Sequence, residues 1–447
     1  AAFPSWRDTP PGSRAMLLFK AAAAARRMRR ELAALQVFEV GKSWSEADAD
    51  VCEAIDFLEY YGREMIRLGV ARPMGDAPGE SSRLFYEPRG VAVVIAPWNF
   101  PLAISMGMVS AALVAGNTVV YKPASQSPVT GSMVARVFEE AELPAGVLNF
   151  LPGPGAEIGD LLVTHPDVAL VAFTGSREVG LRINEMAART AEGSCGVKNV
   201  IAEMGGKNAI IVDVDADLDE AIPQILQSAF GYQGQKCSAC SRLIVLEEHH
   251  ERLLARLKAA AESLPLGPSE DPANFMGAVI DASARKKIMQ YIEIGKQEGE
   301  ILLQRHFGDA SGHYVPLTLF TGICAEHRLA REEIFGPVLS IMKARDMDEA
   351  IRIANATDYA LTGGLFSRSP AAIEKVSREF RVGNLYINRG CTGALVGRHP
   401  FGGFKHSGVG SKAGGPDYLL QFMVPRNVVE NTLRRGFAPM DSMHRRR

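Results

Sequence analysis

Residues 90–123 read GVAVVIAPWNFPLAISMGMVSAALVAGNTVVYKP, with no charged residue before Lys122. An uncharged run of this length could cross a bilayer as a single helix. Pro97 and Pro101, and then the Gly-Asn pair at 116–117, divide it instead into strand, loop, helix and strand. The stretch therefore predicts a buried α/β segment rather than a membrane span.

The same alternation of strand-like and helical segments continues on the C-terminal side of this stretch. Short runs rich in Val, Ile and Ala alternate with helical patterns, and most of the runs end in Gly or Pro. Continuous apolar strands alternating with helices indicate a parallel sheet covered on both faces, whose ligands bind beyond the carboxyl ends of the strands. The strand candidates are NTVVYKP at 117–123, VLNFLPG at 147–153, VALVAFTG at 168–175, NVIAEMG at 199–205 and NAIIVD at 208–213.

A second α/β series is predicted from about residue 207 to 410. It contains four further strand candidates, at 241–248, 336–344, 360–367 and 382–388, and two helices, at 250–264 and 347–357. The N-terminal part has Ala, Leu, Met and Arg at helical spacing, which predicts helices within 13–40 and 45–69. Two segments, 81–90 and 418–433, read as extended pieces outside both series.

Bulk composition narrows the function classes. A chain of 447 residues is expected to form more than one domain. The net charge of −2 offers no electrostatic case for binding nucleic acid or an anionic membrane. Six cysteines are too sparse for a disulfide framework, which favours a reducing compartment and predicts a cytoplasmic protein. The N-terminal residues lack both an initiator Met and the order of a signal peptide, so we expect the sequence to begin within a longer protein.

The stretch GYQGQKCSACSRLIV, residues 231–245, places Cys237 and Cys240 three apart. Structural zinc would need two more ligands; there is no second Cys pair, and a strand-like run separates these cysteines from His249 and His250, so no metal site is predicted. A redox dithiol would sit at a strand-to-helix turn, whereas this pair enters a strand. Either both thiols pack in the core, or Cys237 is a nucleophile and Cys240 packs at the start of the strand.

Several predicted strands end in polar residues suited to a dinucleotide site. Gly175 and Ser176 open a helix whose N-terminus could bind phosphate, although a tight turn accounts for them equally well. Lys122 ends a neighbouring strand, and Glu203 ends another before two glycines, positions where solvated side chains are also common. Asn99, held between two prolines, suits an oxyanion donor.

Taken together, seven motifs resemble the aldehyde dehydrogenase superfamily in order and approximate spacing, and the likeness runs from near residue 1 to past 425. The motifs are PWNFPL at 97–102, KPA at 122–124, FTGS at 173–176, EMGGKN at 203–208, GQKCSA at 234–239, EEIFGPVL at 332–339 and PFGGFKHSG at 400–408. The resemblance implies an α/β fold with a Rossmann-like NAD-binding domain (1–80 and 93–205), an α/β catalytic domain (206–412) and a small β bridging element (81–92 and 413–435). That element would serve formation of a homo-oligomer.

Within the superfamily, three stretches resemble the branch that oxidises L-glutamate γ-semialdehyde, formed from 1-pyrroline-5-carboxylate, to L-glutamate in proline catabolism. They are EAIDFLEYYGREM at 53–65, GQKCSACSR at 234–242 and SGVGSKAGGPDYLLQFM at 407–423. The likeness implies that the first few dozen residues of the family are absent here. The same module forms the C-terminal half of bifunctional proline-utilisation enzymes, so a fused or cooperating proline dehydrogenase is an expected partner.

Two other functions compete with this one. Another NAD(P)-dependent aldehyde dehydrogenase, such as one for succinic semialdehyde, would be favoured by an Arg-based carboxylate clamp, and the Gly-rich SKAGGPD loop argues against it. A non-catalytic structural protein with this fold would be indicated by loss of Cys237 or Glu203, and both are present.

Carried over by motif, the resemblance implies roles for individual residues. Cys237 is the nucleophile, Asn99 the oxyanion donor and Glu203 the general base. The superfamily often has Glu where this chain has Ser125; the closer branch commonly has Ser there, so NAD is the expected cofactor and NADP the alternative. The implied cofactor-binding residues are Trp98, Lys122, Ser125, Gly175, Ser176, Glu333 and Phe335. The implied substrate-binding residues are Phe100, Ser238, Gly414, Gly415 and Phe422.

Overall fold

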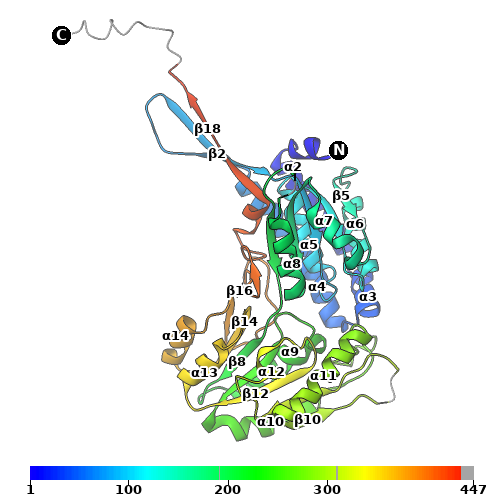
Figure 1. Ribbon diagram of the computed structural model, residues 1–447, viewed down its shortest axis with the longest axis vertical. Helices are drawn as coiled ribbons and strands as arrows, with labels where there is room; N and C mark the ends of the chain where they lie inside the picture. The colour runs from blue at the N-terminus through cyan, green and yellow to red at the C-terminus, as the bar shows by residue number, and fades with distance from the viewer. Residues whose placement is uncertain (191, 309–310, 434–447) are drawn as a thin grey trace, which may run out of the picture.

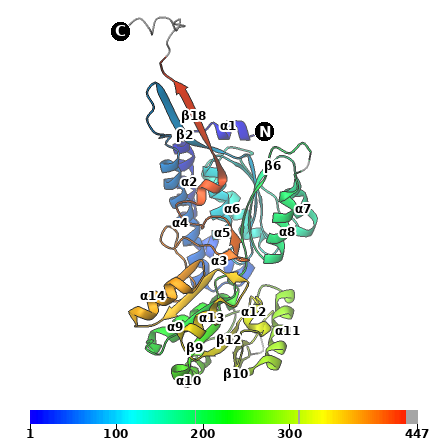
Figure 2. The ribbon, with the colours of Figure 1, turned by 60° about the vertical axis from the view of Figure 1, so that its left-hand side comes forward.

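The chain folds around two largely parallel sheets, each covered by helices, with a β arm projecting from one end (Figures 1 and 2). This computed structural model describes residues 1–433 except 191, 309 and 310. The α/β fold class predicted from the alternating pattern is confirmed. Among the helices of the described residues, none combines the length and hydropathy needed to cross a membrane.

The first sheet has the strand order β17-β7-β6-β3-β4-β5. Consecutive strands run outward from β3 to β5, after which the chain returns to the other side of β3, so that a topological switch point lies between β3 and β6. Loops diverge there at the carboxyl ends of the strands, which favours a ligand site. The strands are β3 (Val91–Ile95), β4 (Thr118–Lys122), β5 (Leu148–Phe150), β6 (Val168–Thr174), β7 (Asn199–Glu203) and the antiparallel β17 (Gly408–Val409).

The first sheet and the helices α1 to α8 form the first lobe, and the helices bury both faces of the sheet. Ala92 and Val94 of β3 join the core beneath the α2, α4 and α5 layer, whereas Val93 joins a smaller core with α8. Residues 90–123 therefore form a strand, a buried helix and a strand, as predicted. The helices are α1 (Phe3–Arg7), α2 (Pro11–Arg27), α3 (Arg29–Val40), α4 (Trp44–Leu68), α5 (Ala103–Val114), α6 (Pro128–Glu140), α7 (Gly155–Thr164) and α8 (Arg177–Ala188).

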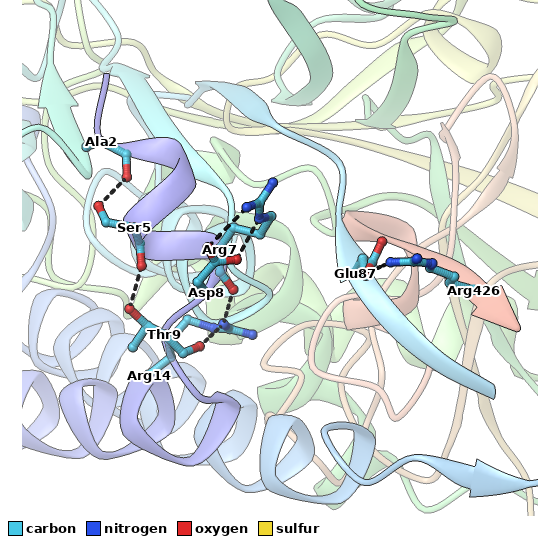
Figure 3. Close-up of polar contacts among 8 residues, drawn as sticks. All are labelled: Ala2, Ser5, Arg7, Asp8, Thr9, Arg14, Glu87 and Arg426. Carbon is cyan, nitrogen blue, oxygen red and sulfur yellow. Dashed lines mark hydrogen bonds and ion pairs between the residues drawn. The ribbon is translucent and has the colours of Figure 1, made fainter. Parts of the chain in front are cut away.

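Buried Arg14 ties the N-terminal turns to the far end of α5. Its Nε donates to the carbonyl of Val114 over 2.8 Å, and its Nη1 donates to the carbonyls of Arg7 and Thr9. Figure 3 shows Arg14 with Arg7 and Thr9, and Arg7 paired to Asp8. Because α5 begins at the loop that contains Asn99, these contacts hold the opposite end of the same helix.

The second sheet has the order β10-β11-β12-β9-β8-β14-β15, parallel except for β10. Its strands are β8 (Asn208–Val212), β9 (Cys240–Leu246), β10 (Glu300–Arg305), β11 (Leu317–Thr321), β12 (Val338–Ala344), β14 (Thr362–Phe366) and β15 (Asn384–Ile387). The helices and turns around it are α9 (Leu218–Phe230), η1 (Gly231–Gly234), η2 (Glu247–His249), α10 (His250–Glu262), α11 (Ala282–Glu298), α12 (Arg328–Arg331), α13 (Met347–Asn355) and α14 (Pro370–Glu379). The predicted helices at 250–264 and 347–357 correspond to α10 and α13. Helix α9 was not predicted; Pro223 within it is typical of a helix break.

The β arm consists of β1 (Arg72–Pro73), β2 (Glu80–Pro88) and β18 (Met423–Asn431), all antiparallel. An ion pair of 2.7 Å between Arg426 and Glu87 joins β18 to β2 (Figure 3). The prediction that 418–433 is extended throughout was wrong at its start, since residues 418–422 form the 3-10 turn η3 (Tyr418–Phe422). Its apolar residues are buried against the first lobe, and that packing is not visible in the local pattern.

The predicted domain boundaries can be compared with the strand pairing. Strand β17, within the range 206–412 predicted as the catalytic domain, pairs with β7 of the first sheet. A two-stranded sheet of β13 (Tyr359–Ala360) and β16 (Phe404–Lys405) precedes it. Residues 434–435 of the predicted bridging element lie outside the described residues. The use of the arm in oligomerisation stays a prediction.

Candidate active site

A cavity of about 260 Å³ lies where the two lobes meet. Glu203 reaches it from the carboxyl end of β7, and Cys237 and Ser238 reach it from the loop before β9. Phe100, from the loop after β3, forms part of the same wall. Residues brought from separate sheets therefore share one buried space, which is the usual setting of an enzyme site.

The Cys237 loop is held by close backbone contacts. The amide of Asn208 donates to the carbonyls of Cys237 (2.8 Å) and Ala239 (2.9 Å). A Cβ on Gly206 would lie 2.4 Å from the Cys237 carbonyl oxygen, so only glycine permits this approach. Just before the loop, Tyr232 and Gln233 both adopt positive φ values, 53° and 56°. Strained residues of this kind persist where surrounding contacts determine the backbone, which is common at active sites.

The electrostatics at Cys237 disfavour its charged form. Burial, with the carboxylates of Glu203 and Glu333 nearby, raises the pKa of the Cys237 thiol well above its ordinary value, while the Ser238 N–H lowers it. The thiol is therefore protonated at neutral pH. Reaction as a nucleophile then requires a group that takes its proton.

Glu203 has the properties of a base. Burial raises the pKa of its carboxyl to about 7, opposed by Lys412 and by the Ala413 N–H. Its Oε1 is buried and has no hydrogen-bond partner among the described residues. A carboxylate that titrates near neutrality with a free oxygen in a cavity suits general-base catalysis.

Asn99 links the β3 loop to the Cys237 loop. Its side chain is buried, and its Nδ2 donates to the carbonyl of Gln235 over 3.0 Å. Gln235 is itself buried and accepts the N–H of Ile280 on its side chain. An amide has two N–H donors, so a second remains for another acceptor, and its use by an oxyanion stays a prediction.

The predicted cofactor residues gather at the switch point of the first sheet. Ser176 caps α8 by accepting the Val179 N–H, and Gly180 packs so closely on Met204 that a Cβ would lie 2.6 Å from its sulfur. Gly175 precedes this helix start. Close helix–sheet packing and an open helix N-terminus are what a pyrophosphate group requires.

Lys122 lies at the end of β4, where its Nζ donates to the Pro123 carbonyl over 2.9 Å. Burial lowers the pKa of Lys122, and an ammonium has further donors for ribose hydroxyls. Ser125 is exposed in the following loop. These residues, with Ser176, fit an adenine dinucleotide.

Three further predicted cofactor residues come from the contact between the lobes. Trp98 lies edge-on to Phe335, with ring centroids 5.6 Å apart, and Phe335 has a positive φ of 61°. The Oε1 of Glu333 accepts the N–H of Gly206, in the loop between β7 and β8, over 2.8 Å. A Cβ on Gly205 would collide with that carboxylate.

The structure does not bring all the predicted substrate residues to the cavity wall. Ser238 and Phe100 line it, whereas Gly414, Gly415 and Phe422 are not among its lining residues. The Gly414 N–H donates to the Tyr61 hydroxyl over 2.8 Å. Phe422 is fully buried and packs on Tyr418, a lining residue, with ring centroids 5.3 Å apart. Their substrate roles stay predictions.

One stripe of α4 was missed by the sequence analysis. Glu46, Asp50, Glu53, Phe57 and Tyr61 all line the cavity. Their spacing of about one or two helical turns puts them on one face, and acids that share a stripe with buried aromatic residues were a signal available in the sequence. Burial raises the pKa of Glu53 to about 8.

Cys240 is the buried first residue of β9, and its Sγ donates to the Arg242 carbonyl. The packing role predicted for it is therefore confirmed. Within the described part of the chain, no group of three or more His, Cys, Asp or Glu side chains is arranged to hold a metal ion.

Comparison with known proteins bears on this geometry. The model of the "Aldehyde dehydrogenase family" matches residues 1–428. The 1-pyrroline-5-carboxylate dehydrogenase of Geobacillus kaustophilus is 54% identical over 429 residues, which cover 96% of this chain and 83% of that protein. A Thermus 1-pyrroline-5-carboxylate dehydrogenase with bound NAD is similar in structure, with a TM-score of 0.93, 49% identity, and coverage of 96% of this chain and 83% of that one.

A second kind of solved structure also matches. Proline utilization A from Bdellovibrio bacteriovorus, inactivated by N-propargylglycine, has a TM-score of 0.96 and 52% identity and covers 98% of this chain. The present chain spans 46% of that longer one. The family model and these relatives agree with the seven ordered motifs, and the chain belongs to the aldehyde dehydrogenase family.

Proposed function

We propose that this chain oxidises L-glutamate γ-semialdehyde, the open form of 1-pyrroline-5-carboxylate, to L-glutamate with NAD as the oxidant. The observation that carries the proposal is the meeting of the Cys237 thiol and the Glu203 carboxylate in one buried cavity between the lobes. The names of the Geobacillus and Thermus relatives support the substrate, and the NAD bound to the Thermus protein supports the cofactor.

The first step belongs to Cys237. The thiol proton is released to solvent as the sulfur adds to the aldehyde carbon, and the carbonyl oxygen becomes an oxyanion in a thiohemiacetal. The remaining Asn99 N–H and the backbone N–H of Cys237 stabilise that oxygen. Because the Asn99 amide is held by Gln235 and the Cys237 carbonyl by Asn208, little reorganisation is needed during reaction.

A bound nicotinamide cofactor would supply the acceptor for the hydride that leaves the thiohemiacetal carbon, so that Cys237 would then carry a thioester. Gly175, Ser176, Lys122 and Glu333 would hold the cofactor, with Trp98 and Phe335 beside it. Glu203 then takes a proton from water, whose oxygen attacks the thioester carbon; the C–S bond breaks, the acid is released, and the proton on Glu203 passes to the departing sulfur. Ser238 would bind the α-carboxylate and Phe100 would enclose the aliphatic chain, with Gly414, Gly415 and Phe422 supporting these groups from outside the cavity lining.

The cellular location, the source of the substrate and the oligomeric state are also proposals. The six cysteines are all free in the structure, which supports a reducing cytoplasmic location. Similarity to proline utilization A supports a proline dehydrogenase as the fused or separate source of the substrate. The projecting β2–β18 arm supports a homo-oligomer (Figure 1).

The substrate is tested by assaying the purified protein with pyrroline-5-carboxylate, succinic semialdehyde and acetaldehyde, each with NAD and with NADP. We expect kcat/KM for pyrroline-5-carboxylate to exceed the others by at least about a hundredfold, since buried groups that bind the α-substituents are left unpaired by simpler aldehydes. Equal or better turnover of the simple aldehydes would overturn the substrate. Equal rates with NADP would overturn the cofactor preference.

Asn99→Ala should lower kcat/KM by about a hundredfold, because loss of one oxyanion donor costs about 3 kcal/mol of transition-state stabilisation. Steady-state kinetics measures the loss. Alkylation of Cys237 by iodoacetamide is the control, since that reaction develops no oxyanion and should keep its rate. Unchanged kcat/KM in Asn99→Ala would contradict the role.

A further inference from the structure

A fully buried ion pair lies at the cavity wall, where Asp50 is a lining residue, and has no part in the steps proposed above. The Nζ of Lys42, in the turn before α4, lies 2.8 Å from Oδ2 of Asp50 on α4, and neither side chain is exposed. Taking two charges out of water is costly, and such pairs are often no more stable than apolar residues of the same size. The contacts of this pair with the active-site loops indicate what it does.

Asp50 caps a helix that is not its own. Its second oxygen, Oδ1, accepts the N–H of Ala103, the first residue of α5, over 2.9 Å. The N-cap position of α5, Leu102, has no side chain that can accept this bond. The loop with Asn99 and Phe100 runs directly into this helix start, so Asp50 holds its C-terminal end.

Lys42 makes the second contact. Its Nζ lies 4.0 Å from the centroid of the Phe100 ring and 5.1 Å from that of Tyr232. Such cation–π contacts are strengthened when the cation is desolvated. Tyr232 belongs to η1, which leads into the Cys237 loop, and its hydroxyl donates to the Val40 carbonyl over 3.0 Å. Lys42 therefore joins the Asn99–Phe100 loop to the loop that carries the nucleophile.

We propose that Asp50 and Lys42 are positioning residues, which hold the Asn99–Phe100 loop against the Cys237 loop so that the Asn99 amide meets the oxyanion formed at Cys237. This inference rests on the proposed roles of Asn99 and Cys237. It predicts that variants of the pair slow the oxyanion-forming reaction of Cys237 only when Asn99 is present. If the pair merely stabilised the fold, the same variants would slow that reaction whether or not Asn99 is present.

The test uses Lys42→Met and Asp50→Asn, which remove charge with little change in shape, and the double variant Lys42→Met/Asp50→Asn. The double variant leaves no buried charge without its partner, so it keeps the test open if a single variant fails to fold. Asp48→Asn is the matched control, because Asp48 lies on the same helix in an exposed pair with Arg29.

Two reactions of Cys237 that need no cofactor are compared. Hydrolysis of p-nitrophenyl acetate passes through an oxyanion, whereas alkylation by iodoacetamide does not. We expect the variants of the pair to lose about tenfold in ester hydrolysis, as small misplacements of reacting groups do, and to keep their alkylation rate. In an Asn99→Ala background the same changes should cause no further loss.

The inference would be overturned if the variants of the pair lowered the rate of ester hydrolysis in Asn99→Ala by the same factor as in the wild-type protein. It would also be overturned if ester hydrolysis and alkylation fell equally. Failure of the wild-type protein to oxidise the semialdehyde, with ester hydrolysis intact, would refute the proposed substrate alone. Ester hydrolysis by the single and double variants of Asn99 and Asp50 would still decide the positioning role.

Discussion

Cys237→Ala is expected to abolish aldehyde oxidation, with kcat lower by at least about 10⁴-fold, the scale seen when an enzyme loses its nucleophile. The thiol lies in the cavity with Glu203, and the backbone carbonyl of Cys237 is held by the Asn208 amide. No other thiol replaces it in the motif, because Cys240 is buried as the first residue of β9. Steady-state formation of NADH with pyrroline-5-carboxylate measures the effect.

Two controls make this result specific. Cys324→Ala changes an exposed cysteine and should leave kcat unaltered. NAD binding, followed by quenching of tryptophan fluorescence, should persist in Cys237→Ala, which shows that the cofactor lobe is intact. Substantial turnover by Cys237→Ala would remove covalent catalysis from the mechanism.

Glu203→Gln is expected to stall the enzyme after the redox step. Hydrolysis of the thioester needs a base, so steady-state kcat should fall by about 10²–10⁴-fold while a first equivalent of NADH still forms. Stopped-flow absorbance shows the burst, and intact mass should show a glutamyl group on Cys237. Unchanged steady-state turnover would sink the assignment of Glu203 as the base.

The pH dependence of the wild-type enzyme follows from the same carboxyl. Burial raises the pKa of Glu203 to about 7, and only the ionised form can accept a proton. Activity should therefore fall as pH decreases through about 7, and this limb should be missing in Glu203→Gln. A wild-type profile that is flat from pH 8 to pH 5.5 would contradict the assignment.

As pH rises through this range, the free energy of unfolding should decrease while activity increases. The folded pKa of about 7 exceeds the ordinary value of 4.5, so the folded state retains a proton that the unfolded state releases between these values. The free energy of unfolding therefore decreases as pH rises through that window. At pH 8 the buried charge costs up to about 3 kcal/mol, and Glu203→Gln should recover part of it in urea unfolding. The gain should vanish near pH 4.5.

The catalytic and cofactor candidates could be predicted because their placement is local. Lys122, Ser176 and Glu203 each end or follow a strand of one parallel sheet, and the carboxyl ends of such strands meet at one edge. The apolar runs that identify those strands are continuous in the sequence. The fold class followed for the same reason, and the structure confirms it.

The walls of the cavity could not be predicted in the same way. The spacing of Glu46, Asp50 and Glu53 shows that they share a helix face, but nothing in that spacing states what the face meets. The surroundings of Gly414 and Phe422 likewise depend on tertiary packing, since these residues contact the Tyr61 hydroxyl and the Tyr418 ring, and their substrate roles stay predictions.

The sequence by itself determined the two α/β series, the nucleophile candidate and the family, because strand patterns and motifs are properties of neighbouring residues. Only the tertiary structure decided that Asp50 caps α5, that Lys42 lies between two active-site loops, and that a stripe of acids faces the cavity. Asp50 and Ala103 are 53 residues apart. A contact of that range depends on how whole helices pack against each other, and the helices carry no local signal of their partner.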